Sequence, residues 1–275
     1  MHASARPVIT TAEFAQFARF IYDAAGITMS EAKKTLVGGR LAKRLDHWQV
    51  STYAEYFKIL QGGDTLEVQT AIDLLTTNET YFFREPKHFE LLRERALAAR
   101  AGQGPFRVWS AACSSGEECY SIAMVLADCL GTRGAWEVLG TDICTRVLRR
   151  AQAAHYRLDR ASHVPQAYLK KYCLKGQGSQ QGTLLVERAL RERVRFGQVN
   201  LNTTLPQLGQ FDLVFLRNVM IYFSSDTKQA VVARIAATLK PDGRLVIGHA
   251  ESLNDIAGIG AVVAPVATSV YRRAA

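Results

Sequence analysis

The first 75 residues carry apolar side chains at steps of three and four and show no strand-like alternation. Thr10 and Glu13 form a capping box, which predicts that a helix starts there, and Gly26 ends that helix. We therefore expect an all-α N-terminal domain over residues 1–75. Its further helices are predicted near 30–48, 51–60 and 65–77.

From residue 106 the pattern changes to short apolar strands that alternate with amphipathic helices. Such alternation implies parallel pairing, because a helix must carry the chain back to the start of the next strand. The pattern predicts an α/β domain over 76–275 with a doubly wound sheet that ends in an antiparallel hairpin. The expected strands are 106–112, 137–142, 194–200, 211–218, 243–249, 261–266 and 269–273, and the expected helices are 116–130, 145–156 and 226–240.

One segment, at about 160–193, interrupts this alternation. It is rich in glycine and then β-prone, so we expect a small antiparallel insertion with Gly176, Gly178 and Gly182 at its turns. A glycine run could also indicate a phosphate cradle. That interpretation lacks support, because no helix follows whose N-terminus would hold the phosphate.

The composition is that of an ordinary globular protein, with 48% hydrophobic and 21% charged residues. The N-terminus lacks the apolar core of a signal peptide, and no run reaches the roughly 18 uncharged apolar residues of a membrane span. The five cysteines form no CxxC pair, and their spacing fits neither a zinc site nor a disulfide framework. We expect a cytoplasmic protein with no bound metal and no direct membrane insertion.

The net charge of +9 is concentrated in one region, since residues 146–200 hold twelve basic and three acidic side chains. Such a patch fits a phosphate backbone or an acidic protein partner, and charge alone does not decide between them. Residues 1–75 are balanced, but Lys33, Arg40 and Arg44 form a narrow stripe on the second helix. The stripe is either a docking face or an ordinary solvated face.

Polar side chains follow successive predicted strands. Glu117 comes after the first strand, Asp142 ends the second and Asn200 ends a later one, and such ends meet at one edge of a doubly wound sheet. The first turn contains one glycine, Gly116, whereas dinucleotide and P-loop motifs need more. This favours a nucleoside ligand without phosphates, such as S-adenosylmethionine. Simpler interpretations are that the helix dipole favours Glu117 and that Asp142 caps the next helix.

Seven segments, in order along the chain, resemble the CheR family of chemotaxis-receptor glutamate O-methyltransferases. The most specific are TTNETYFFRE at 76–85 and RNVMIYF at 217–223, and the resemblance runs from about residue 10 to the end. Cys119 stands where a proline is common in the family. The other segments are WSAACSSGEECYS at 109–121, GTDI at 140–143, VNL at 199–201, LKPDGRL at 239–245 and GHAES at 248–252.

The resemblance implies a Rossmann-like domain that uses S-adenosyl-L-methionine to methylate receptor glutamates, giving methyl esters for sensory adaptation and releasing S-adenosyl-L-homocysteine. It places Arg84 and Tyr222 on the substrate side, although Tyr222 could instead pack its ring under the sheet. The Lys33, Arg40 and Arg44 stripe would face the methylation helices of the receptor. The implied cofactor contacts are Asn78, Thr80, Arg84, Glu117, Asp142, Asn200, Leu201, Arg217 and Asn218.

The resemblance also implies that the insertion, through its compact Gly176, Gly178 and Gly182 turn, docks a receptor's C-terminal pentapeptide. Alternatively, the basic residues there keep an exposed edge strand soluble. We expect a monomer that is recruited to membrane receptors and has no nucleic-acid partner.

Three other functions remain open from the residues alone. A nucleic-acid methyltransferase would use the basic patch, but the chain lacks the Asn/Asp-Pro-Pro-Tyr/Phe motif of base amino-methylation. A small-molecule methyltransferase would not need the basic N-terminal helix. A non-catalytic receptor adaptor would have lost part of the cofactor set, which is complete here.

Overall fold

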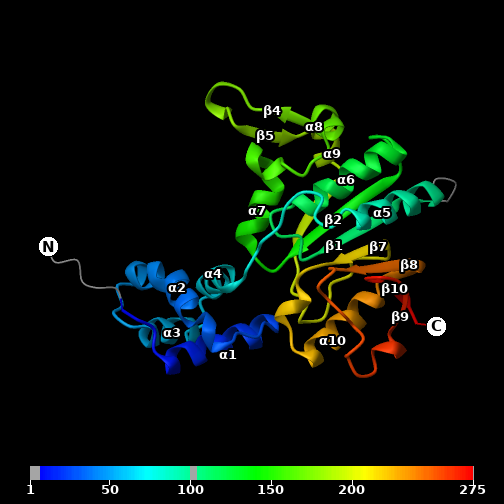
Figure 1. Cartoon of the computed structure of the whole chain (residues 1–275). Coiled ribbons are helices and arrows are strands. Elements are labelled where there is room, and N and C mark those ends of the chain that lie inside the picture. The colour runs from blue at the N-terminus through cyan, green and yellow to red at the C-terminus, as the bar shows by residue number, and fades with distance from the viewer. Residues whose placement is uncertain (1–6, 100–103, 275) are drawn as a thin grey trace. The chain divides into compact units, whose positions relative to one another are not determined.

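The computed structural model describes residues 7–99 and 104–274, and the chain forms two compact units (Figure 1). One unit is the helical segment that ends at Thr77, together with Tyr222–Thr227. The other comprises Asn78–Ile221 and the segment that begins at Lys228. Within the described ranges, no helix has the length and apolar character needed to span a bilayer.

The helical unit confirms the capping box. The Glu13 N–H donates to the Thr10 hydroxyl, the Thr10 N–H donates to the Glu13 carboxylate at 2.9 Å, and Gly26 at φ 71° ends the helix. Before the second helix, a 3-10 turn at Glu31–Lys33 replaces the first turn of the helix predicted from residue 30. The helices are α1 (Thr11–Ala25), α2 (Lys34–Trp48), α3 (Tyr53–Gln61) and α4 (Thr65–Leu75).

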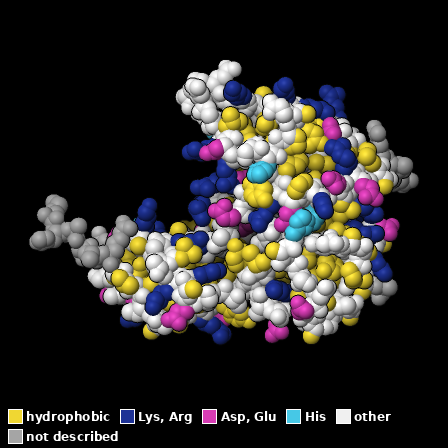
Figure 2. Space-filling view, in the orientation of Figure 1, with side chains coloured by type: hydrophobic (Ala, Val, Ile, Leu, Met, Phe, Trp, Pro, Cys, Tyr) yellow, Lys and Arg dark blue, Asp and Glu magenta, His cyan; other side chains and the backbone are white. Residues whose placement is uncertain are grey.

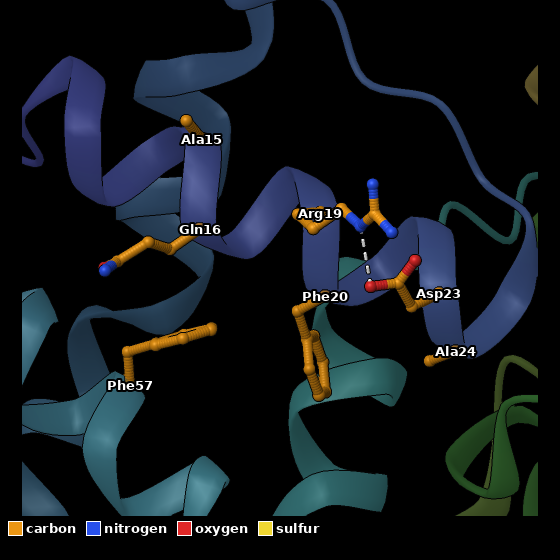
Figure 3. A pocket seen from close by; sticks show the side chains of 7 residues that line it. All are labelled: Ala15, Gln16, Arg19, Phe20, Asp23, Ala24 and Phe57. Atoms are coloured by element: carbon orange, nitrogen blue, oxygen red, sulfur yellow. Dashed lines mark hydrogen bonds and ion pairs between the residues drawn. The ribbon is translucent and has the colours of Figure 1, made fainter.

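A groove of about 680 Å³ runs along α1 (Figure 3). Phe20 from α1 and Phe57 from α3 contribute aromatic walls, and Arg19 pairs with Asp23 at 2.8 Å on the same helix. Arg19 and Asp23 pair with each other, so the rest of the groove lining is mainly apolar and is suited to packing rather than to binding a charged ligand. Its lining consists of Ala15, Gln16, Arg19, Phe20, Asp23, Ala24 and Phe57.

The second unit contains a seven-stranded sheet in the order β6-β2-β1-β7-β8-β10-β9. The first five strands in this order pair in parallel, and β9 and β10 form the predicted antiparallel hairpin. Strand β10 also pairs antiparallel with β8. The strands are β1 (Phe106–Ala111), β2 (Trp136–Asp142), β6 (Val194–Gln198), β7 (Phe211–Leu216), β8 (Leu239–Ile247), β9 (Val263–Ala267) and β10 (Val270–Arg273).

Helices that connect these strands along the chain pack on the sheet. Helix α6 contacts β1, β2 and β6, α7 contacts β2 and β6, and α5 packs against α6. Helix α5 follows Pro86 and was not expected from the sequence pattern. The helices are α5 (Lys87–Ala98), α6 (Glu117–Leu130), α7 (Thr145–Ala153) and α10 (Ser225–Ala236).

The insertion forms a second, antiparallel sheet in the order β3-β5-β4, so this part of the fold prediction is confirmed. The Gly176 N–H donates to the Thr183 carbonyl, while Gly178 and Gly182 have φ values of 56° and 81° that favour glycine. The sheet begins at residue 155, before the predicted start. Its elements are β3 (His155–Arg157), α8 (Gln166–Tyr172), β4 (Cys173–Lys175), β5 (Thr183–Val186) and α9 (Arg188–Arg191).

The strand order places the switch point of the large sheet between β1 and β7. From β1 the chain moves to β2 and then β6 on one side, and it returns to β7 and β8 on the other. Ligands of doubly wound sheets bind outside the carboxyl ends of the strands at this point. The loops that follow β1, β2 and β7 are therefore where a cofactor site is expected.

Candidate cofactor site

The loop after β1 has an unusual backbone and is tied to two other segments. Ala112 and Ser114 have φ values of 75° and 50°, a left-handed conformation that is rare outside glycine. The Ser114 N–H donates to Asp142 Oδ2 at 2.8 Å, and its hydroxyl donates to the Asn78 carbonyl at 2.7 Å. Strained residues that persist in a fold mark functional loops. This loop brings together two of the predicted cofactor residues, Asp142 and Asn78.

Asp142 lies at the end of β2 and is buried. Its second oxygen, Oδ1, accepts the Cys144 N–H at 2.9 Å, so the carboxylate bridges two loops. The cap residue of α7 is Cys144, which rules out Asp142 as the N-cap itself. A buried carboxylate at the end of a strand is a group that can accept hydrogen bonds from ligand hydroxyls.

Gly116 is the N-cap of α6 and has φ 91°. A Cβ atom at this position would lie 2.8 Å from the Ala151 Cβ and 3.0 Å from the Tyr156 hydroxyl. Glycine is therefore required both by the backbone conformation and by the close packing of α6 on α7. It sets where the first turn of α6, with its two glutamates, begins.

Glu117 is 1% exposed and is held by hydrogen bonds from both sides. The Ser115 hydroxyl donates to it at 2.6 Å, and Arg160 donates at 2.9 Å. Arg160 also donates to the Thr80 carbonyl at 2.6 Å, so one guanidinium joins two predicted cofactor residues. Sequence reasoning missed Arg160, which lies in the insertion and has no motif around it.

Arg217 is buried between two carboxylates. Its guanidinium contacts Glu118 at 2.8 Å and Glu85 at 3.1 Å, donates to the Arg84 carbonyl, and lies over the ring of Phe89. Burial raises the pKa of Glu118 although Arg217 opposes the shift. Burial also acts to raise the pKa of Glu85, but Arg217 and the surrounding donors outweigh it and hold that pKa below its usual value. The Arg217 side chain is thus engaged within the protein, and its cofactor contact stays a prediction.

Glu251 organises the segment that follows Arg217. Its carboxylate accepts the N–H groups of Asn218, Met220 and Gly248, each at 2.8 Å. Burial raises the pKa of Glu251 in spite of these hydrogen bonds. Asn218 has φ 58°, so the carboxylate holds a strained residue that the sequence predicted to contact the cofactor. Glu251 lies in the GHAES segment, which was noticed only as part of the resemblance.

Asn200 and Leu201 lie beyond β6, which ends at Gln198, so the prediction that Asn200 ends the strand was two residues too long. The Asn200 side-chain oxygen accepts the Asn202 N–H at 2.9 Å. The Leu201 carbonyl accepts two hydrogen bonds from Arg234, at 2.8 and 3.0 Å. Arg234, which sequence reasoning also missed, therefore fixes this loop.

Arg84 is half-buried, and its guanidinium makes one long hydrogen bond to the Glu79 carbonyl at 3.4 Å and lies 5.6 Å from the Tyr81 ring centre. Among the residues that the structure describes, no carboxylate forms an ion pair with it. A guanidinium without an internal anion is suited to bind an anionic group of a ligand.

Tyr222 belongs to the helical unit. Its carbonyl accepts the Thr28 N–H at 2.8 Å and the Thr28 hydroxyl at 3.0 Å, and the Lys33 ammonium lies 5.3 Å from its ring centre. Tyr222 therefore lies beside Lys33, one residue of the predicted receptor-facing stripe. Its role in catalysis stays a prediction.

The two arginines of the stripe make contacts inside the helical unit. Arg40 donates to the carbonyls of Leu75 and Thr76 at 3.0 and 3.1 Å. Arg44 pairs with the buried Glu67, which also accepts a hydrogen bond from the Tyr56 hydroxyl at 2.6 Å. Periodicity revealed the stripe but not Glu67, which comes from another helix. The stripe is thus neither freely solvated nor wholly available to a partner.

The donor and acceptor groups of the second unit fit S-adenosylmethionine. Buried carboxylates at Glu117 and Asp142 can accept hydrogen bonds from hydroxyl or ammonium groups, and side-chain amides can recognise an adenine edge. The first loop has no second or third glycine and no lysine to cradle phosphates. The residues present therefore suit a nucleoside without phosphates that carries an amino-acid tail better than a nucleotide.

Comparisons with known proteins agree with this geometry. Residues 12–76 match the family model described as CheR methyltransferase, all-alpha domain, and residues 78–263 match CheR methyltransferase, SAM binding domain. A chemotaxis protein methyltransferase from Escherichia coli (strain K12) is 40% identical over 256 residues, covering 91% of this chain and 88% of the relative.

A second relative is chemotaxis protein methyltransferase 2 of Pseudomonas aeruginosa, which is 38% identical over 88% of this chain and 87% of its own length. A solved glycopeptide N-methyltransferase, MtfA, complexed with S-adenosylmethionine is 16% identical, covers 58% of this chain and 48% of its own, and has a TM-score of 0.34, which is too low to support an argument. Together, the two family models and these relatives span most of the chain. The chain therefore belongs to the CheR methyltransferase family and is an S-adenosylmethionine-dependent methyltransferase.

Proposed function

We propose that this enzyme methylates glutamate side chains on the cytoplasmic helices of chemotaxis receptors, giving methyl esters for sensory adaptation. The observation that carries the proposal is the Arg84 guanidinium, with which no carboxylate of the described residues forms an ion pair. The next residue, Glu85, contacts Arg217, and the Arg84 carbonyl accepts a hydrogen bond from Arg217. An acidic methyl acceptor is the substrate that such a group suits. The relatives from E. coli and P. aeruginosa are named as chemotaxis methyltransferases, which favours a receptor as the substrate.

The reaction depends more on the alignment of the attacking carboxylate with the methyl group than on acid–base catalysis. A glutamate carboxylate, with an ordinary pKa near ~4.3, is ionised at pH 7 and needs no general base. The bound cofactor supplies a methyl group on a positively charged sulfur. Arg84 orients the attacking carboxylate without protonating it, and the loops tied together by Asp142, Glu117 and Glu251 hold the site rigid. We further propose that Arg84 rather than Tyr222 makes the decisive substrate contact.

Methyl transfer from labelled S-adenosylmethionine to receptor-enriched membranes tests the proposal. The product should be base-labile and should release labelled methanol, because a methyl ester hydrolyses in alkali whereas N-methyl groups do not. The Arg84→Ala variant should lose transfer while its S-adenosylhomocysteine binding shows whether the cofactor site survives. Label that enters nucleic acid, or that resists alkali, would overturn the proposal.

The basic patch at 146–200 gives weaker support to a nucleic-acid substrate than its charge suggests. Figure 2 shows Lys and Arg side chains spread over the region of α7 and α8. Several of them already have acidic partners: Arg160 pairs with Glu117 at 2.9 Å and Lys171 with Asp128 at 3.2 Å. Arg157 and Arg188 also form ion pairs. The patch is thus partly neutralised within the protein.

Asp142→Ala is expected to weaken S-adenosylhomocysteine binding by about 1.5–3 kcal/mol, the scale of a lost hydrogen bond to a charged group. The carboxylate is buried and joins the loops after β1 and β2 through Ser114 and Cys144. Calorimetry would measure the affinity, and circular dichroism would check that the variant is folded. A folded variant with unchanged affinity would remove Asp142 from the cofactor site.

For receptor docking, Lys33→Glu is expected to reduce receptor methylation and to leave cofactor binding unchanged. Arg40→Glu and Arg44→Glu are poorer tests. Reversal at Arg44 leaves the buried Glu67 without its cation and should destabilise the helical unit by about 3–5 kcal/mol, and reversal at Arg40 breaks its hydrogen bonds to the Leu75 and Thr76 carbonyls. Lys43→Glu, at an exposed position on α2, is the matched control. Equal methylation by both lysine variants at physiological salt would make the stripe an ordinary solvated face.

We also propose that the insertion docks an aromatic and acidic peptide at the C-terminus of a receptor. Strand β4 pairs with β5 alone among the described strands, so its other edge can accept a further strand. Beside it lies a pocket of about 460 Å³, where Leu174, Leu185 and His155 occupy one register row. Lys175 lines the same pocket and can attract an anionic peptide. Tethering would raise the local substrate concentration for a monomeric enzyme recruited to membrane receptors.

Gly176→Ala is expected to abolish this peptide binding while cofactor binding persists. A Cβ at this position would lie 2.0 Å from the Gln180 carbonyl oxygen and 2.5 Å from the Thr183 hydroxyl, so the turn must rearrange. Gly197→Ala is the matched control, since nothing lies within 4 Å of its Cβ position. Titration of receptor C-terminal pentapeptides measures the effect. The absence of saturable binding by the wild-type protein would make the enzyme independent of such peptides.

A further inference from the structure

Glu85, His88 and His249 form a cluster of metal-ligating side chains in the second unit. One ligand atom from each lies within 4.8 Å of the other two. Glu85 lies just before α5 and His88 in its first turn, whereas His249 follows β8, and the His249 N–H donates to Glu85 Oε2 at 3.2 Å. This main-chain hydrogen bond holds the two segments together. The sequence predicted no metal, because the spacing of the five cysteines fits no zinc site, and that prediction did not consider the histidines.

His88 is the member of the cluster whose buried ring nitrogens have no hydrogen-bond partner among the described residues. It is 4% exposed. A buried polar group without a partner is rare and points to a missing ion or water. Its Nδ1 lies 3.4 Å from Glu85 Oε2, and its ring centre lies 4.7 Å from that of His249. Burial lowers the pKa of His88 to about 4.

We infer that Glu85, His88 and His249 bind a divalent transition metal ion of the zinc type through one carboxylate oxygen and two imidazole nitrogens. Two histidines and a glutamate, with a fourth position for water, form a known tetrahedral zinc set. Imidazole ligands favour zinc, copper or nickel over magnesium or calcium. Ligand atoms in such a set lie about 3.3 Å apart, so the cluster must contract by about 1.5 Å. His249 is exposed and can rotate to close it.

The metal would act on the cofactor side of the unit through Glu85. The same carboxylate contacts Arg217 at 3.1 Å and accepts a hydrogen bond from Asn218 at 3.2 Å. A dication bound there repels the guanidinium and competes for the carboxylate oxygens. On the predicted cofactor contacts of Arg217 and Asn218, zinc opposes cofactor binding, and by linkage S-adenosylhomocysteine weakens zinc binding by the same factor.

Titration of tag-free protein with Zn²⁺ alone, against a chromophoric chelator, tests the site. The wild type should bind one ion saturably, and His249→Gln should bind it at least about tenfold more weakly. His163→Gln is the matched control, because His163 is exposed and contacts only the Tyr81 ring among the interactions described. Its zinc affinity should equal that of the wild type.

Co²⁺ identifies the ligands independently of affinity. The cobalt protein should show the visible absorption of a tetrahedral nitrogen and oxygen site, without the sulfur charge-transfer band that one of the five cysteines would give. A sulfur band would overturn the assignment. So would a zinc dissociation constant above about 100 µM, or equal zinc affinity in the wild type, His88→Gln and His249→Gln.

Discussion

Arg217→Met is expected to lower the free energy of unfolding of the methyltransferase unit by about 3–5 kcal/mol, the cost of removing one partner of a buried ion pair. Methionine can fill much of the space between the aromatic rings of Phe89 and Phe215, but it carries no charge. The carboxylates of Glu118 and Glu85, 15% and 13% exposed, would then be left without their cation. The loss is thus electrostatic rather than a loss of packing.

Urea unfolding followed by tryptophan fluorescence measures the effect. In a Trp48→Phe background the remaining tryptophans, Trp109 and Trp136, are both buried in the methyltransferase unit and report on it alone. Adding Glu118→Gln to Arg217→Met removes one stranded charge and should recover at least about 1 kcal/mol. A single variant within about 0.5 kcal/mol of the wild type would contradict a structural role for the ion pair.

Sequence periodicity predicted the large sheet well because its strands are apolar and its helices amphipathic. Strand β1 and helix α6 lie within one residue of their predicted bounds, and the antiparallel hairpin at the end was also predicted. The short elements α8, α9 and β3 were not, because three to seven residues give too few positions for a period to emerge. In the insertion, glycine at the turns was the stronger signal.

Site residues were predictable where they sit at strand ends, as Asp142 does, because topology alone brings such ends together. Their partners were not. Arg217 lies 99 positions from Glu118, and Arg160 lies 43 positions from Glu117, so no local pattern connects them. The same holds for the stripe: periodicity places Arg44 on one face of α2, but the side chain that meets it comes from α4.

Glu251→Ala is expected to weaken S-adenosylhomocysteine binding at least tenfold and to lower the free energy of unfolding by about 3 kcal/mol or more, since each N–H left unpaired costs about 1–3 kcal/mol. The carboxylate accepts three main-chain N–H groups, from Asn218, Met220 and Gly248. No other described side chain makes these hydrogen bonds. Without them, the left-handed conformation of Asn218 is less stable. The segment after β7 should then relax away from the geometry that the cofactor requires.

Two further variants separate positioning from general destabilisation. Glu251→Gln keeps one acceptor oxygen and should give an intermediate affinity, because its amide nitrogen cannot accept the remaining N–H groups. Glu94→Ala removes an exposed glutamate on α5 and should change neither quantity. If Glu251 acts by positioning, calorimetry will show affinity falling in the order wild type, Gln, Ala, at temperatures where all three are folded. Equal affinity in the three proteins would mean that the carboxylate stabilises the fold but does not shape the cofactor site.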